Sequence, residues 1–172
     1  MNLPKPSVAE LFEDHMQAEM DGDLERTMAT MGPNPHLNHV PVRAGGSGQR
    51  GVREFYDAHL VGKFFPPDVE ITNISRTTDT VQMVDELLVR FTHTQAIDWI
   101  LPGVPATGRS VQIPLVVIVR ADAGLVTHEH IYWDQAAVLV QIGLIDPAGL
   151  PVTGADQAAQ INEPTGAYRS EY

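Results

Sequence analysis

The chain has 172 residues, 43% of them hydrophobic, and contains no cysteine. This length suffices for one domain with its own core, and the lack of cysteine excludes disulfides, thiolate catalysis and thiolate zinc sites. The net charge of -11 argues against nucleic acid as a partner, because phosphate binding requires clustered basic side chains. No signal core is recognisable, and the longest apolar run, Leu115 to Val119, is too short to cross a membrane. We therefore expect a cytoplasmic protein without a membrane partner.

Three helices are predicted in the first third of the chain. Ser7 and Glu10 have the spacing of a capping box, which predicts a first helix that ends close to Asp23. Asp23 is then expected to cap a second, short helix that ends near Met31. The spacing of apolar residues predicts a third helix over residues 49–60.

Two short segments connect the second and third helices. Residues 37–42 are expected to be extended. The glycine-rich residues 45–48 are interpreted as a flexible connection. They do not form a phosphate-binding loop, because no Lys-Ser or Lys-Thr pair follows them.

The second half of the chain changes to the alternation that is typical of strands. Four strands are predicted, over residues 69–76, 81–94, 111–120 and 127–134. Pro114 interrupts the third of these and indicates an edge strand or a bulge. Helices followed by a run of long strands indicate an α+β fold.

The chain is expected to end in a helix and a tail. Residues 135–144 read as a final short helix, which places a single domain in residues 1–146. Residues 147–172 are rich in Gly, Pro and Ala and are expected to form a tail that is extended or packs on a partner subunit.

The strand over residues 127–134 carries most of the ionisable side chains that could form a site. Its residues alternate between two faces. One face carries His128, His130, Tyr132 and Asp134, and the other carries Thr127, Glu129, Ile131 and Trp133. We assign the site to the first face, because perturbed histidines concentrate at functional sites. A shift of one residue would exchange the two faces, and the sequence does not decide which of them points inward.

The region from Thr92 to Asp146 resembles the SnoaL-like polyketide cyclase branch of the nuclear transport factor 2-like superfamily. The resemblance rests on the loop Pro102–Arg109, the Ala-Gly turn, the strand His-Glu-His-Ile-Tyr-Trp-Asp and the segment Val-Leu-Val-Gln-Ile-Gly-Leu. It implies a cone-shaped, curved, mixed or antiparallel sheet that wraps around the N-terminal helices and encloses one apolar pocket. It also implies a homodimer, acid/base chemistry without a cofactor or metal, and an acid/base aspartate that corresponds to Asp134.

The predicted site residues fall into two groups. The catalytic candidates are His130, Asp134 and His128. The ligand-binding candidates are His39, Tyr132, His15 and Glu19. Each has a structural alternative: the two strand histidines could pair at a dimer interface, Asp134 could cap the following helix, and His15 with Glu19 could form a surface ion pair.

Three functions are compatible with these residues. The first is a cofactor-free cyclase, isomerase or lyase, in which His130 or Asp134 removes a proton next to a carbonyl of an apolar substrate. The second is a non-catalytic protein that binds a small apolar ligand. The third, which we rank last, is a metal site formed by His128, His130 and either His39 or Glu129.

Overall fold

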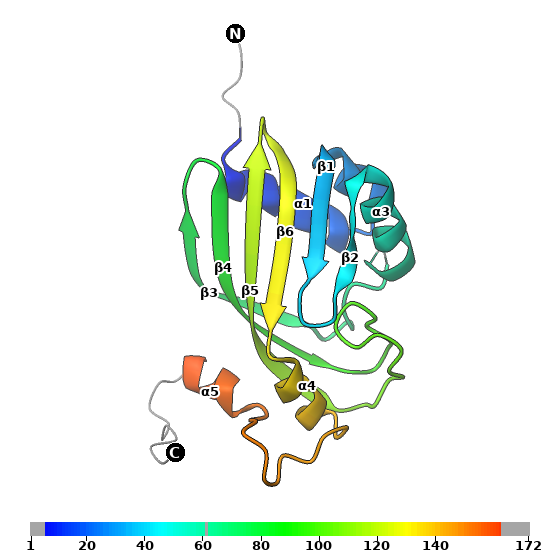
Figure 1. The fold of residues 1–172 in the computed structure, drawn as a ribbon, viewed down its shortest axis with the longest axis vertical. Coiled ribbons are helices and arrows are strands. Elements are labelled where there is room, and N and C mark those ends of the chain that lie inside the picture. The colour runs from blue at the N-terminus through cyan, green and yellow to red at the C-terminus, as the bar shows by residue number, and fades with distance from the viewer. Residues whose placement is uncertain (1–5, 61, 163–172) are drawn as a thin grey trace.

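The computed structural model describes residues 6–60 and 62–162. Its six strands form one sheet in the order β2-β1-β6-β5-β4-β3, in which β1 and β6 are parallel and the other neighbours are antiparallel. The strands are β1 (Met31–His39), β2 (Ala44–Ser47), β3 (Glu70–Thr78), β4 (Gln82–Thr92), β5 (Ser110–Asp122) and β6 (Leu125–Trp133). The sheet is curved, and α1 (Val8–Met20) crosses one of its faces (Figure 1). The predicted α+β fold is confirmed.

The N-terminal helices begin where their caps predict. Ser7 Oγ accepts a hydrogen bond from the Glu10 amide at 3.2 Å, and the Glu10 carboxylate accepts one from the Ser7 amide at 2.8 Å. Asp23 caps α2 (Leu24–Ala29) by accepting a hydrogen bond from the Arg26 amide at 3.0 Å. The predicted third helix is α3 (Gly48–Phe55), which continues as the π-helical turn η1 (Tyr56–Leu60).

The glycine-rich segment was predicted wrongly as a flexible connection. It is strand β2, in which Gly45 and Gly46 pair with Asn38 and Leu37 of β1. A methyl group on Gly46 would approach the backbone of Gly51 in α3 more closely than van der Waals contact allows. The glycines therefore allow a helix and a strand to pack against each other.

The prediction for Pro114 was also wrong, because β5 is a central strand. The neighbouring strand β6 ends at Trp133, which pairs with Leu115, so no strand residue lies beyond it opposite Pro114. The backbone amide of Gln112 points to the same side of β5 as the nitrogen of Pro114. It donates a hydrogen bond to the Gln141 side chain in α4 (Gln135–Gln141). Proline at this position therefore removes no hydrogen bond between strands.

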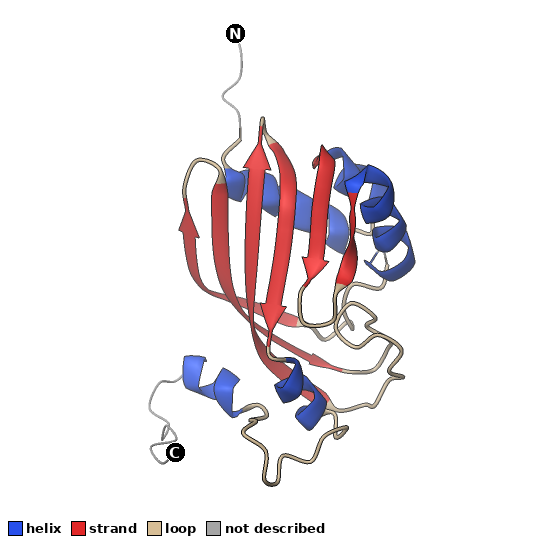
Figure 2. Ribbon diagram, in the orientation of Figure 1, coloured by secondary structure: helices blue, strands red, loops and turns tan. Residues whose placement is uncertain are grey.

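The segment beyond residue 146 contains a helix, α5 (Asp156–Asn162). Gln157 of α5 donates a hydrogen bond to the Asp134 carboxylate at 2.9 Å, and Ala158 is fully buried. In Figure 2, α4 and α5 lie at the end of the sheet where β6 ends. This part of the predicted tail folds back on its own chain, and residues 163–172 lie outside the described residues.

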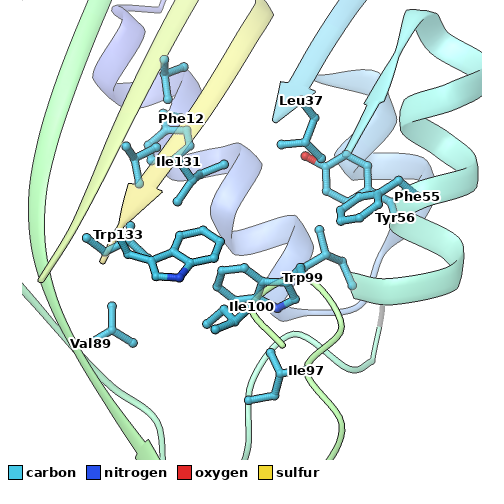
Figure 3. Packing of buried hydrophobic residues seen from close by; sticks show 14 of the residues in the cluster. Phe12, Leu37, Phe55, Tyr56, Val89, Ile97, Trp99, Ile100, Ile131 and Trp133 are labelled. Carbon is cyan, nitrogen blue, oxygen red and sulfur yellow. The ribbon is translucent and has the colours of Figure 1, made fainter. Parts of the chain in front are cut away.

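Aromatic residues fill the space between the sheet and the helices. Trp99 and Trp133 meet edge to face with their ring centroids 6.2 Å apart, and Phe55 and Tyr56 approach from the side of α3 (Figure 3). This core forms one wall of the pocket described below. No helix among the described residues is long and apolar enough to span a membrane.

Candidate functional site

An interior cavity lies between α1 and the concave face of the sheet. Three ionisable side chains line it, Glu19, His39 and Glu129, and the rest of its wall is almost entirely apolar. The other lining residues are Met16, Leu37, Leu60, Phe64, Phe65, Ile71, Leu87, Val89, Trp99, Leu115, Val117 and Ile131. An apolar pocket with a few converging polar groups is the usual form of a small-molecule site.

The cavity is small as it stands. Its volume is about 40 Å³, which holds only a few water molecules. Phe64, Phe65 and Ile71 are only half-buried or exposed, although they line the cavity. A substrate larger than this volume requires these side chains to move apart.

His15 lies behind the cavity wall at the centre of a buried polar network. Its Nε2 atom lies 3.1 Å from Glu19 Oε1, 3.4 Å from Glu129 Oε2 and 3.0 Å from the Tyr56 hydroxyl. Its Nδ1 atom lies 2.6 Å from Thr30 Oγ1. The buried stripe of α1 therefore carries both His15 and Glu19 towards the strand that holds Glu129.

The hydrogen bonds of this network fix the protons on His15. Thr30 donates its single hydroxyl hydrogen to the Thr27 carbonyl at 2.7 Å, so it accepts a hydrogen bond from His15 Nδ1. Burial alone would lower the pKa of His15. The carboxylates of Glu19 and Glu129 outweigh that effect and raise the pKa to about 10. His15 is therefore an imidazolium held between two carboxylates.

Tyr56 completes the network as a neutral hydrogen-bond donor. Burial and the neighbouring carboxylates of Glu19 and Glu129 raise the pKa of its hydroxyl well above the usual value. The hydroxyl donates to Glu129 Oε2 over 3.5 Å. Both Tyr56 and His15 therefore hold the Glu129 carboxylate in place.

His39 reaches the cavity as a neutral imidazole. It is packed between Phe55, Trp99 and Trp133, and burial lowers its pKa to about 4 despite the nearby charge of Glu129. Its Nδ1 atom donates to the Ala44 carbonyl at 3.2 Å, which leaves the lone pair on Nε2. His39 can therefore accept a hydrogen bond from a ligand.

The predicted site residues divide between the two faces of the sheet. Glu19 and His39 line the cavity, and His15 lies behind its wall in contact with Glu19, while their role in ligand binding stays a prediction. His128, His130 and Tyr132 lie on the opposite face of β6, where Tyr132 is 40% exposed. The cavity face of β6 carries Glu129, Ile131 and Trp133, so the choice of the first face as the pocket face was wrong.

Asp134 caps the helix that follows it, which is the structural alternative that its sequence position offered. It is the N-cap of α4, where its Oδ1 accepts a hydrogen bond from the Ala137 amide at 3.1 Å. Its Oδ2 accepts one from Gln157, and the residue does not line the cavity. Its predicted catalytic role therefore has no support from its position.

Sequence reasoning missed three members of the network, Thr30, Tyr56 and Glu129. Tyr56 belongs to the apolar stripe of the third predicted helix, and Glu129 was placed on the face opposite the site. The usable signal was that the next two residues on the same face as Glu129, Ile131 and Trp133, are apolar, since apolar residues mark the buried face of a strand.

The same network contains the candidate metal ligands of the cavity. Ligand atoms of His15, Glu19 and Glu129 lie within 4.8 Å of one another, close enough for one divalent ion. Metal binding there would require His15 Nε2 to lose its proton, because a histidine that binds a metal must present a free lone pair. The positive charge of the imidazolium compensates one of the two carboxylate charges.

The family comparison agrees with this architecture. Residues 12–129 match the family model described as "SnoaL-like domain". The chain belongs to the SnoaL-like domain family. No curated protein matched the chain.

Several solved structures share the fold. IdmH from Streptomyces antibioticus, a candidate polyketide cyclase, is 20% identical over 80% of this chain and 99% of its own, with a TM-score of 0.60. A candidate SnoaL-like polyketide cyclase from Jannaschia sp. CCS1 is 18% identical over 85% of this chain and 100% of its own, with a TM-score of 0.61. Delta 5-3-ketosteroid isomerase from a Mycobacterium species is 18% identical over 74% of this chain and 92% of its own, with a TM-score of 0.52. At these identities the similarity shows the fold.

Proposed function

We propose that this protein is a cofactor-free acid/base enzyme of the cyclase, isomerase or lyase type, acting on an apolar substrate that contains a carbonyl group. The observation that supports this most is the pair of carboxylates, Glu19 and Glu129, which face a cavity that is apolar apart from His39 and share one buried imidazolium. The structural neighbours include a candidate polyketide cyclase and a ketosteroid isomerase, which agrees with this class of chemistry.

Glu129 is the residue that we assign as the base. Its carboxylate removes a proton from the carbon next to the substrate carbonyl, and the electron pair of the broken C–H bond moves to the carbonyl oxygen as an enolate. The proton is then returned to carbon, or the enolate attacks a second carbonyl of the same substrate. The chemistry needs no electron acceptor and no second reactant.

The surrounding residues position this base. His15 and Tyr56 fix the orientation of the Glu129 carboxylate, so little reorganisation is needed when the proton moves. His39, neutral and rigidly packed, accepts a hydrogen bond from a hydroxyl of the substrate or of the enol. The apolar wall excludes water and favours proton transfer within the cavity.

Exchange of hydrogen for deuterium next to a ketone tests the proposed step directly. The probe is β-tetralone in D₂O, followed by proton NMR, because its exchange reports enolisation without knowledge of the natural substrate. We expect the wild-type protein to accelerate the exchange, and Glu129→Gln to lose about 100-fold or more of that acceleration, the usual contribution of a general base.

Glu86→Gln is the matched control, since Glu86 lies on the opposite face of the same sheet, where its carboxylate contacts Ser75. Its exchange rate should equal that of the wild type. Equal rates for Glu129→Gln and wild type would exclude Glu129 as the base. Binding of β-tetralone without any accelerated exchange would favour the second candidate function, a protein that only binds a small apolar ligand.

The predicted homodimer stays a prediction, which analytical ultracentrifugation tests.

A further inference from the structure

Three histidines meet on the face of the sheet that points away from the cavity. His36 of β1 is the direct neighbour of His128 of β6 in the parallel pairing, and His130 lies two residues further along β6. His36 Nδ1 lies 2.8 Å from His130 Nε2. The rings of His128 and His130 stack with their centroids 3.9 Å apart. We call these three residues the histidine cluster.

Cross-strand pairing places the three rings side by side. Residues at i and i+2 of a strand point to the same face, and a directly paired residue on the next strand points with them. The strands are held by their backbone hydrogen bonds, whereas His128 and His130 are half-buried and His36 is exposed, so the side chains can rotate about their own bonds. The cluster thus combines a fixed backbone with adjustable rings.

The environment favours the neutral form of two of the three histidines, because it lowers the pKa of His128 and of His130. Burial, followed by the neighbouring imidazoles and Arg120, lowers the pKa of His128, although Glu129 opposes this. Burial and the neighbouring His36 lower the pKa of His130 in the same way. Neutral imidazole is the form that binds metal ions.

We propose that the histidine cluster binds a divalent transition metal ion such as Zn²⁺, Ni²⁺ or Cu²⁺. Imidazole nitrogen is a preferred ligand of these ions. Two nitrogens on one tetrahedral Zn²⁺ are about 3.3 Å apart, as follows from Zn–N bonds of about 2.0–2.1 Å. The observed 2.8 Å between His36 and His130 lies close to that value, so a small rotation replaces the hydrogen bond by a shared metal ion.

Among the described residues only His15, Glu19 and Glu129 have three ligand atoms within 4.8 Å of one another as they stand, so a site with three histidine ligands also requires the His128 ring to rotate. Asn38 lies beside His130 on β1 and can supply an amide oxygen, and otherwise water fills the fourth position. Arg120, opposite His128 on β5, opposes binding through its positive charge. The net charge of -11 acts the other way and attracts cations to the molecule.

A titration of the tag-free protein with Co²⁺ and Zn²⁺ at pH 7.5 tests the site. Visible absorption of Co²⁺ reports its coordination, and isothermal titration calorimetry gives the Zn²⁺ affinity. We expect one ion per chain. His36→Gln, His128→Gln and His130→Gln should each weaken binding at least about tenfold, since even loss of an outer partner of a metal ligand costs about 10–100-fold. His59→Gln, which alters a partly exposed histidine elsewhere, should bind as the wild type does.

A second measurement needs only the wild-type protein. Paramagnetic Co²⁺ or Ni²⁺ should broaden the amide NMR signals of His36, His128 and His130 first. Broadening centred on His15 and Glu19 would place the ion in the cavity network and overturn the proposal. So would fewer than one bound ion per chain, or unchanged affinity in all three cluster variants.

Discussion

His15 carries a charge in a place where charges are normally avoided. It is fully buried, and the free energy cost of burying an ion is offset only by close partners. Glu19 and Glu129 supply this compensation, and Thr30 and Tyr56 take up the remaining hydrogen-bonding capacity. Each member of the network consequently depends on the others.

Replacing His15 tests that dependence. His15→Gln leaves two buried carboxylates without a cation and should lower the free energy of unfolding by about 3 kcal/mol, the cost of breaking a buried ion pair. His15→Gln combined with Glu19→Gln removes one of the two charges and should recover part of the loss. Urea unfolding of the three proteins measures both differences. A double variant less stable than His15→Gln would contradict the ion-pair account.

The candidate site shows where sequence reasoning at the level of single residues succeeds. The spacing of His15 and Glu19 on a helix was sufficient to place them together, because i and i+4 are neighbours on any helix. The faces of β6 were not decided in the same way, since both carry polar and aromatic residues. Partners far away in the chain, α1 and Tyr56, determine that Glu129 rather than His130 points inward.

At the scale of elements, strand β2 illustrates how glycine was misread. A run of glycines has the composition of a flexible linker, and although the sequence predicts the helix that follows, it holds no sign that this helix packs against the glycines. The reason for the glycines is the contact between β2 and α3, which depends on the tertiary structure. The caps at Ser7 and Asp23 were predicted well because they are local.

Two substitutions at neighbouring glycines should have opposite effects. Gly46→Ala places a methyl group against the backbone of Gly51 and should destabilise the protein by about 1–3 kcal/mol, as overpacking does. Gly51→Ala lies within α3 with only ordinary contacts nearby and should stabilise it by about 0.5–1 kcal/mol. Thermal unfolding of the two variants gives the comparison. Equal effects at both positions would refute the packing argument.

At the scale of the whole molecule, two buried histidines should give stability a maximum near pH 6.5. The folded pKa of His15, about 10, exceeds the unfolded value of about 6.5, so its contribution is complete below pH 6.5 and declines as the pH rises towards 10. The folded pKa of His39, about 4, lies below the unfolded value, so its contribution is complete above pH 6.5 and declines as the pH falls towards 4.

Urea unfolding at pH 5.5, 6.5 and 8.5 measures this profile. We expect the free energy of unfolding to fall on both sides of pH 6.5, by up to about 1.4 kcal/mol per pH unit for each histidine. His39→Phe should flatten the acidic side and leave the alkaline side unchanged. A wild-type protein that becomes more stable between pH 6.5 and 8.5 would contradict the charge assigned to His15.

The alternation along β6 has a practical consequence for protein engineering. Glu129, Ile131 and Trp133 form part of the interior, while His128, His130 and Tyr132 occupy the outer surface. A combinatorial library that varies only positions 129, 131 and 133 would sample new interior chemistries on an unchanged exterior. A second library at positions 128, 130 and 132 would redesign the exterior without altering the pocket. The last six residues of β6 thus offer two sets of positions that can be optimised separately and then combined.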